Sequence, residues 1–234
     1  MNIDTLLSYF FPSILSRKMG PFSSRKKAWI KGAYYRGVAP FYFAVGLILL
    51  VGAGFTLFRS IFRANMDIFK GDSLFSGIGV ICMAVAGLFA LINAPVCGKS
   101  HNRGLANFFG VLIDLLILAS GLLIFYCDIR RGYLAPDRGA ISIGMLLLIL
   151  SAMIPLRNGG LSFIISLIGF AGVVVLAIYG RRYFEISRVH IYIIAAFSYV
   201  VIKALIRGLH VRHAILSVTA QQALILERKK QHKS

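Results

Sequence analysis

The sequence predicts an all-α integral membrane protein, a bundle of about six transmembrane helices with an extended cytoplasmic helix at its C-terminal end. Three observations lead to this fold class. The 234-residue chain is 58% hydrophobic, whereas soluble domains contain about 45–50% apolar residues. Its mean hydropathy is +0.80, and apolar stretches of spanning length recur along it. Its basic residues gather between and outside those stretches.

Six apolar segments follow one another, each near the about 20 residues with which a helix crosses the hydrocarbon core. They cover residues 40–62, 73–96, 105–126, 139–156, 161–179 and 189–206. The fourth is the shortest and has Pro155 at its end, and only residues 157–160 separate it from the fifth. We expect these two segments to form a tight helical hairpin. The main alternative is four spans plus one hairpin that does not cross the membrane.

The two ends of the chain carry the most basic residues. Residues 1–39 contain seven Lys and Arg, and residues 203–234 contain another seven. Because segments rich in Lys and Arg remain in the cytoplasm, both ends are expected there, which requires an even number of spans. The predicted parts are a basic amphipathic cytoplasmic segment (1–39), a transmembrane domain (40–206) and a basic amphipathic cytoplasmic helix (207–234). The expected location is a bacterial inner (plasma) membrane.

Two charged residues are expected at or near membrane depth. Asp114 lies in the middle of the third apolar segment, and Lys203 lies near the end of the sixth. An acidic side chain inside a membrane is costly and usually faces the protein interior, where it relays protons, binds a cation or pairs with a base. Two interpretations follow: Asp114 is a functional acid, or it is a structural acid paired with a base such as Lys203. We favour the structural interpretation, because a lone acid makes a poor pathway.

The C-terminal stretch from residue 189 onward contains no proline and one interior glycine, Gly208. Such a stretch can form one helix that leaves the membrane and projects into water. Apolar positions spaced by three and four residues continue beyond the membrane as a short heptad seam. We expect this seam to bind a cytoplasmic protein partner through Leu205, Leu209, Leu216, Ala223 and Leu226. The alternative is a helix that bends at Gly208 and lies on the membrane surface.

The formal charge of +18 predicts contact with anionic lipid headgroups. The residues expected to make it are Arg25, Lys26, Lys27, Lys31, Arg207 and Arg212. Nucleic acid is not an expected partner, because the basic residues alternate with apolar spans and form no soluble basic face. Catalytic motifs, metal-ligand spacings and cofactor-binding patterns are not found in the sequence, so no enzyme activity, metal or cofactor is expected.

The layout of a basic N-terminal segment, six spans and a straight final helix resembles the membrane half of bacterial sensor proteins. In those proteins such a helix leads into a cyclase or kinase domain, so the resemblance implies a role in signalling. The leading hypothesis is a non-enzymatic subunit, or a sensor or anchor module, that docks a cytoplasmic partner or a larger complex through the C-terminal helix. The alternatives are a small oligomeric channel or transporter that uses Asp114, and a lipid-binding protein. We also expect a homo-oligomer or a subunit of a larger membrane complex.

Overall fold

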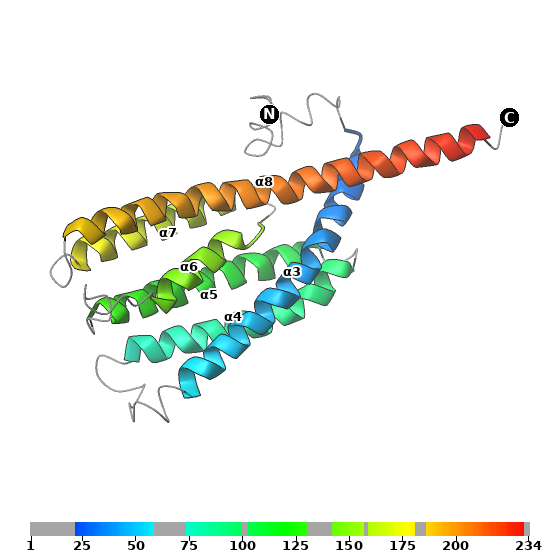
Figure 1. Ribbon diagram of the computed structural model, residues 1–234. Coiled ribbons are helices and arrows are strands. Elements are labelled where there is room, and N and C mark those ends of the chain that lie inside the picture. The colour runs from blue at the N-terminus through cyan, green and yellow to red at the C-terminus, as the bar shows by residue number, and fades with distance from the viewer. Residues whose placement is uncertain are drawn as a thin grey trace.

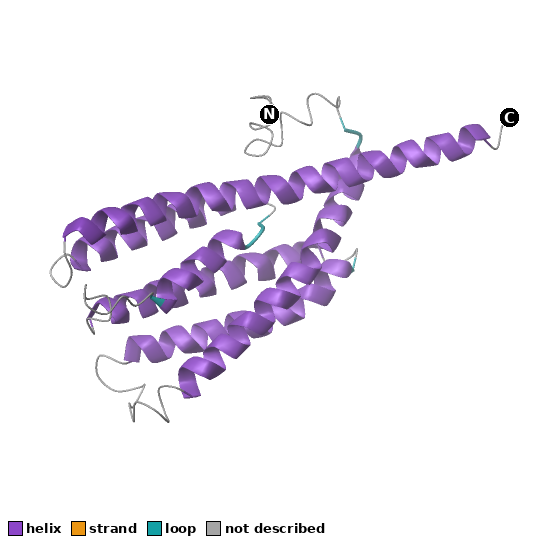
Figure 2. Cartoon of the chain, viewed as in Figure 1, coloured by secondary structure: helices purple, strands orange, loops and turns teal. Residues whose placement is uncertain are grey.

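The computed structural model describes residues 22–58, 74–99, 103–130, 142–156, 159–180 and 186–231. Nearly all of these residues are helical and none of them lies in a strand (Figure 2). The helices are α3 (Ser24–Phe58), α4 (Leu74–Gly98), α5 (Arg103–Arg130), α6 (Ile143–Met153), α7 (Gly159–Gly180) and α8 (Ile186–Gln231). Of the predicted N-terminal segment 1–39, residues 1–21 lie outside the described residues, and residues 24–39 form the first part of α3.

The helices alternate in direction, so the start of α3 and the end of α8 lie at the same end of the bundle (Figure 1). Helices α3 to α6 pack in chain order, each against the next, while α7 packs mainly against α8. Helix α8 also contacts α3 and α6, and α7 contacts α5. Five helices, all except α6, are long and apolar enough to cross a membrane. The prediction of an all-helical membrane bundle is therefore confirmed at this level.

The fourth apolar segment was predicted to span the membrane as a helix over residues 139–156, but its helix is shorter. Helix α6 has 11 residues and is about 17 Å long, roughly half the thickness of the hydrocarbon core. It begins after Ser142, whose Oγ accepts a hydrogen bond from the Met145 N–H at 3.4 Å. It ends before Ile154, which is extended, with φ −66° and ψ 116°. Pro155 explains this end, because the residue before a proline is driven out of the helical conformation.

The predicted hairpin of the fourth and fifth segments is also not what is observed. Helix α6 packs between α5 and α8, whereas α7 packs against α8 and α5, with little contact between α6 and α7. Ile154, Pro155 and Leu156 continue as a buried extended segment after α6. This segment separates the two helices, so a short connection in the sequence does not produce a packed pair.

Glycines set the closest helix contacts. A Cβ placed on Gly46 of α3 would lie 3.0 Å from the Gly87 carbonyl oxygen of α4. A Cβ on Gly144 of α6 would lie 2.5 Å from the Gly121 carbonyl oxygen of α5 and would also overlap the backbone of Phe125. Side chains larger than hydrogen therefore do not fit at these crossings, which is the usual basis of close packing between membrane helices.

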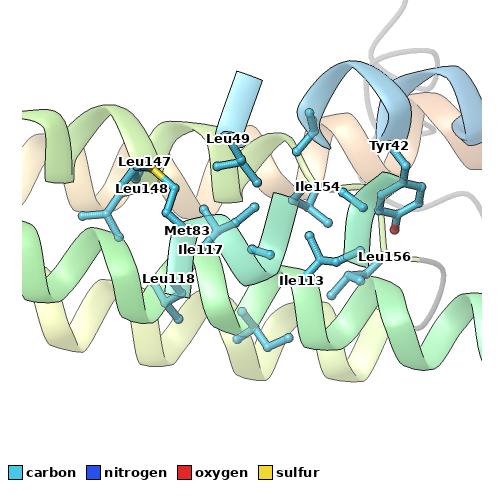
Figure 3. Close-up of a cluster of buried hydrophobic side chains, with 14 of the residues drawn as sticks. Tyr42, Leu49, Met83, Ile113, Ile117, Leu118, Leu147, Leu148, Ile154 and Leu156 are labelled. Atoms are coloured by element: carbon cyan, nitrogen blue, oxygen red, sulfur yellow. The ribbon is translucent and has the colours of Figure 1, made fainter. Parts of the chain in front are cut away.

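The core fills the space between α3, α4, α5 and α6. Figure 3 shows that buried side chains from these helices and from the segment after α6 point toward one another. The labelled members are Tyr42, Leu49, Met83, Ile113, Ile117, Leu118, Leu147, Leu148, Ile154 and Leu156. The outer surface is also apolar, since Val51 is 70% exposed and Ile194 is 65% exposed. An apolar surface of this extent is typical of helices that face lipid.

Candidate functional site

A cluster of polar side chains is sealed inside the bundle where α5, α6 and α8 meet. The Lys203 ammonium donates a hydrogen bond to Asp114 Oδ2 at 2.6 Å and another to the Ser151 carbonyl oxygen at 2.8 Å. The Ser151 hydroxyl donates to Asp114 Oδ1 at 2.6 Å. Both side chains of the ion pair are 0% exposed. The structure therefore brings together the two charged residues that the sequence singled out.

Tyr199 completes this polar cluster from α8. Its hydroxyl lies 3.2 Å from Ser151 Oγ, and its ring centroid lies 5.7 Å from Lys203 Nζ. Tyr199 and Lys203 are one turn apart on α8, so they share a face. The cation therefore has a carboxylate, a carbonyl oxygen and an aromatic ring around it. Such a set of partners offsets much of the cost of placing an ammonium group in an apolar bundle.

The cluster lies at mid-depth in the bundle. Asp114 is 11 residues from the start of α5 and 16 from its end, which places it about 17 Å and about 24 Å from those two ends. The long Lys203 side chain therefore pairs within the bundle instead of reaching the surface. It ties α8 to α5 and α6 at the level where hydrocarbon surrounds the protein. This geometry supports the structural interpretation of Asp114, and a transport role for it stays a prediction.

Ser151 and Tyr199 were not singled out from the sequence as members of this cluster. Ser151 is a small polar residue in an apolar run, and Tyr199 precedes Lys203 by one helical turn. These weak signals identify candidates only after Asp114 and Lys203 have been paired. The same holds for Tyr34, whose hydroxyl donates to the Pro155 carbonyl oxygen at 2.8 Å. That bond joins α3 to the extended segment after α6.

Helix α8 extends beyond the other helices at the end where α3 begins (Figure 1). It is one helix of 46 residues, or about 69 Å. It passes through Gly208, which is buried, without interruption. The continuous helix supports projection beyond the bundle over a bend at Gly208.

A second apolar stripe, Val211, Ile215, Val218 and Ile225, runs beside the predicted seam on the outer half of α8, and the two stripes have different surroundings. Ala214, Ile215 and Val218 are buried, on the side of α8 that contacts α3. The predicted seam faces away from that side: Leu209 is 46% exposed and Leu226 is 61% exposed. Leu216 and Ala223 are exposed as well, and Leu205 is partly buried. The sequence alone did not distinguish which stripe the protein covers with its own helices.

Four of the residues predicted to meet anionic lipid lie on α3, at the end of the bundle from which α8 projects. Arg25, Lys27 and Lys31 are exposed on the first turns of α3. Lys26 is partly buried, with its Nζ 4.8 Å from the Phe22 ring centroid. Arg207 and Arg212 on α8 are partly buried and lie only about 6 Å and about 14 Å beyond Lys203 along the helix. The exposed charges of this set therefore come from α3, while Arg207 and Arg212 lie deeper.

Within the described residues, no group of three or more His, Cys, Asp or Glu side chains is close enough to hold a metal ion. Comparison with known protein families, with curated protein sequences and with solved structures gives no match for this chain.

Proposed function

We propose that this protein is a non-enzymatic membrane subunit that docks a cytoplasmic protein through the exposed seam of α8. Leu209 lies only six residues, about 9 Å, beyond Lys203 and is still at the depth of the bundle, so the docking seam consists of Leu216, Ala223 and Leu226. The exposure of these residues on the helix that extends past the bundle is the observation that carries the proposal. Apolar side chains arranged along one face of a helix in water are normally covered by a partner.

The orientation of the bundle supports a cytoplasmic partner. The end from which α8 projects also carries Arg25, Lys27, Lys31 and Lys99, all of them exposed. Membrane proteins retain such clusters of Lys and Arg on the cytoplasmic side. In this orientation six segments cross, with α6 and the extended residues after it as the shortest crossing. The seam then lies in the cytoplasm or at its boundary with the headgroups.

Charge favours an acidic partner of another sequence over a second copy of this chain. The sequence has 26 Lys and Arg against eight Asp and Glu, and Arg228, Lys229 and Lys230 lie near the end of α8. Two parallel copies of α8 would bring these like charges together, whereas acidic residues beside an apolar stripe would complement them. The proposed occupant is therefore an amphipathic helix with acidic flanks.

Site-specific photo-crosslinking in native membranes tests this proposal. A photoreactive residue is placed at Leu216, Ala223 or Leu226, and in a control at Gln221, which is exposed on the side of α8 toward α3. The expected result is an adduct with one protein species from the three seam positions and not from Gln221. The peptide recovered from that adduct is expected to be helical in pattern and acidic.

A pair of matched variants makes the test quantitative. Leu216→Ser with Leu226→Ser removes two seam side chains, while Leu224→Ser with Ile225→Ser removes two exposed apolar side chains from elsewhere on α8. Burying a leucine contributes about 1.5–3 kcal/mol. The seam variant is therefore expected to bind the partner with an affinity at least about 100-fold lower. The control variant is expected to bind the partner with unchanged affinity. Adducts only with lipid or with a second copy, or equal losses in both variants, would refute the proposal.

A further inference from the structure

A pocket of about 530 Å³ opens between three helix segments at the basic end of the bundle. The first turns of α3 form one wall, the end of α4 forms the second, and the projecting part of α8 forms the third. Its lining residues are Ala28, Trp29, Gly32, Tyr35, Arg36, Cys97, Gly98, Lys99, Val218, Gln221, Leu224, Ile225 and Arg228. A volume of this size is typical of pockets that hold small organic ligands.

Among the described residues, every charged side chain that lines this pocket is positive. Arg36 comes from α3, Lys99 follows the end of α4, and Arg228 comes from α8. All three are exposed, and within the described part of the chain no acidic side chain forms an ion pair with any of them. Three cations from three separate helices around one cavity favour a ligand with an anionic group, such as a phosphate diester.

The other lining residues are mostly apolar or aromatic. Leu224 and Ile225 are exposed on the α8 wall, and Trp29 is 37% exposed on the α3 wall. The Arg25 guanidinium lies 5.6 Å from the Trp29 ring centroid. Tryptophan and arginine together are typical of the layer where headgroups meet hydrocarbon. The pocket thus offers an apolar surface beside its cationic groups, which suits an amphiphile better than a fully polar anion.

The position of the pocket agrees with the membrane level. Arg36 is followed on α3 by the apolar residues of a spanning helix, and Lys99 follows the last residue of α4. These two cations therefore mark the end of the apolar part of the bundle, where lipid phosphates are found. Arg228 lies further out along α8 and can reach back toward the same headgroup.

We propose that this pocket binds one anionic phospholipid from the leaflet at the basic end of the bundle. Its phosphate lies between Arg36 and Lys99, Arg228 contacts the outer part of the headgroup, and apolar glycerol or acyl carbons contact Trp29, Leu224 and Ile225. The site is distinct from the diffuse attraction between the basic helix ends and the bilayer surface. It does not depend on the docking of a protein to the α8 seam, which faces away from α3.

Native mass spectrometry of the full chain, released from nanodiscs, tests the site. The probe lipids are phosphatidylglycerol and phosphatidylcholine, which have similar acyl chains and differ in net charge. The expected result for the unchanged protein is one retained phosphatidylglycerol molecule at lipid ratios where phosphatidylcholine is lost. Inorganic phosphate at millimolar concentration is not expected to displace it, because phosphate cannot use the apolar wall.

Charge-matched variants separate the pocket from the general surface charge. Arg36→Gln with Lys99→Gln removes two charges from the pocket, and Lys27→Gln with Lys31→Gln removes two exposed charges of α3 that do not line it. The affinity for phosphatidylglycerol is expected to fall about ten-fold further in the pocket variant than in the control, because only Arg36 and Lys99 contact the phosphate directly. Equal losses would show diffuse attraction only and would overturn the proposal.

A third variant blocks the pocket without changing its charge. A Cβ on Gly98 meets no atom within 4 Å, so Gly98→Phe places a ring beside the pocket without a clash at Cβ. Loss of the retained lipid in this variant is expected. Retention of the lipid in both Gly98→Phe and the pocket charge variant would overturn the proposal, as would release of the lipid by inorganic phosphate alone.

Discussion

Breaking the Asp114–Lys203 pair is expected to destabilise the bundle, and removing both charges together is expected to restore it. In Lys203→Met, the Asp114 carboxylate keeps the hydrogen bond from Ser151 Oγ but loses its cation at 2.6 Å. Removing one partner of a buried ion pair costs about 3–5 kcal/mol, because the remaining charge stays in an apolar environment. Asp114→Leu is expected to cost a similar amount, since Lys203 is also sealed inside the bundle.

The double variant, Asp114→Leu with Lys203→Met, leaves few groups without a partner. Ser151 Oγ and the Tyr199 hydroxyl lie 3.2 Å apart and can bond to each other. The Ser151 carbonyl oxygen also accepts a hydrogen bond from the Ile154 N–H at 3.1 Å. Replacing a buried pair by apolar side chains of similar volume is often neutral. The free energy of unfolding of the double variant is therefore expected to lie within about 1 kcal/mol of the unchanged protein.

The assay is an unfolding titration with sodium dodecyl sulfate in mixed micelles, followed by fluorophores attached near the ends of α5 and α8. The double-mutant cycle is expected to give a favourable coupling energy of at least about 3 kcal/mol. The structural interpretation would be refuted if each single variant lowered the free energy of unfolding by less than about 1 kcal/mol. It would also be refuted if the loss in the double variant equalled the sum of the losses in the two single variants. Measurement of ion flux in liposomes accompanies the cycle. Flux that is present in the unchanged protein and lost in the folded double variant would favour the transport hypothesis.

Two further predictions concern packing. Gly144→Val is expected to destabilise the bundle by about 1–3 kcal/mol or more, because its Cβ would overlap the backbone of α5 at Gly121 and Phe125. Gly54→Ala meets no atom within 4 Å and is expected to be neutral in the same titration. The Asn93 side-chain amide is fully buried and has no hydrogen-bond partner among the described residues. Asn93→Leu is therefore expected to raise the free energy of unfolding by about 1–3 kcal/mol. A loss of stability in Asn93→Leu would instead show that the amide is satisfied in the membrane.

The fold class could be predicted from composition and periodicity because spanning helices need long apolar stretches and leave basic residues at their ends. The length of α6 could not be predicted from hydropathy, which does not distinguish helical from extended apolar residues. Pro155 carried the relevant signal, since it restricts the conformation of Ile154 and ends the helix.

The pairing of Asp114 with Lys203 was one option among several at the sequence level. These residues are 89 positions apart, and the local sequence around each does not indicate which helices pack against each other. The sequence also could not show which of the two apolar stripes of α8 is covered by the protein's own helices, because both have helical spacing. Only the packing of α3 against α8 shows that Ile215 and Val218 are covered while Leu216 remains exposed.

The position of the ion pair along α8 has a mechanical consequence. Lys203 lies 23 residues before Leu226 on one uninterrupted helix, a distance of about 35 Å. With the pair as a pivot, a tilt of α8 by about 10° at Lys203, in which the α3 helix packed against it moves too, would displace Leu226 by about 6 Å. A rearrangement within the bilayer that repacks α5 or α6 against α8 would therefore shift the projecting end of α8 by about the rise of one helical turn.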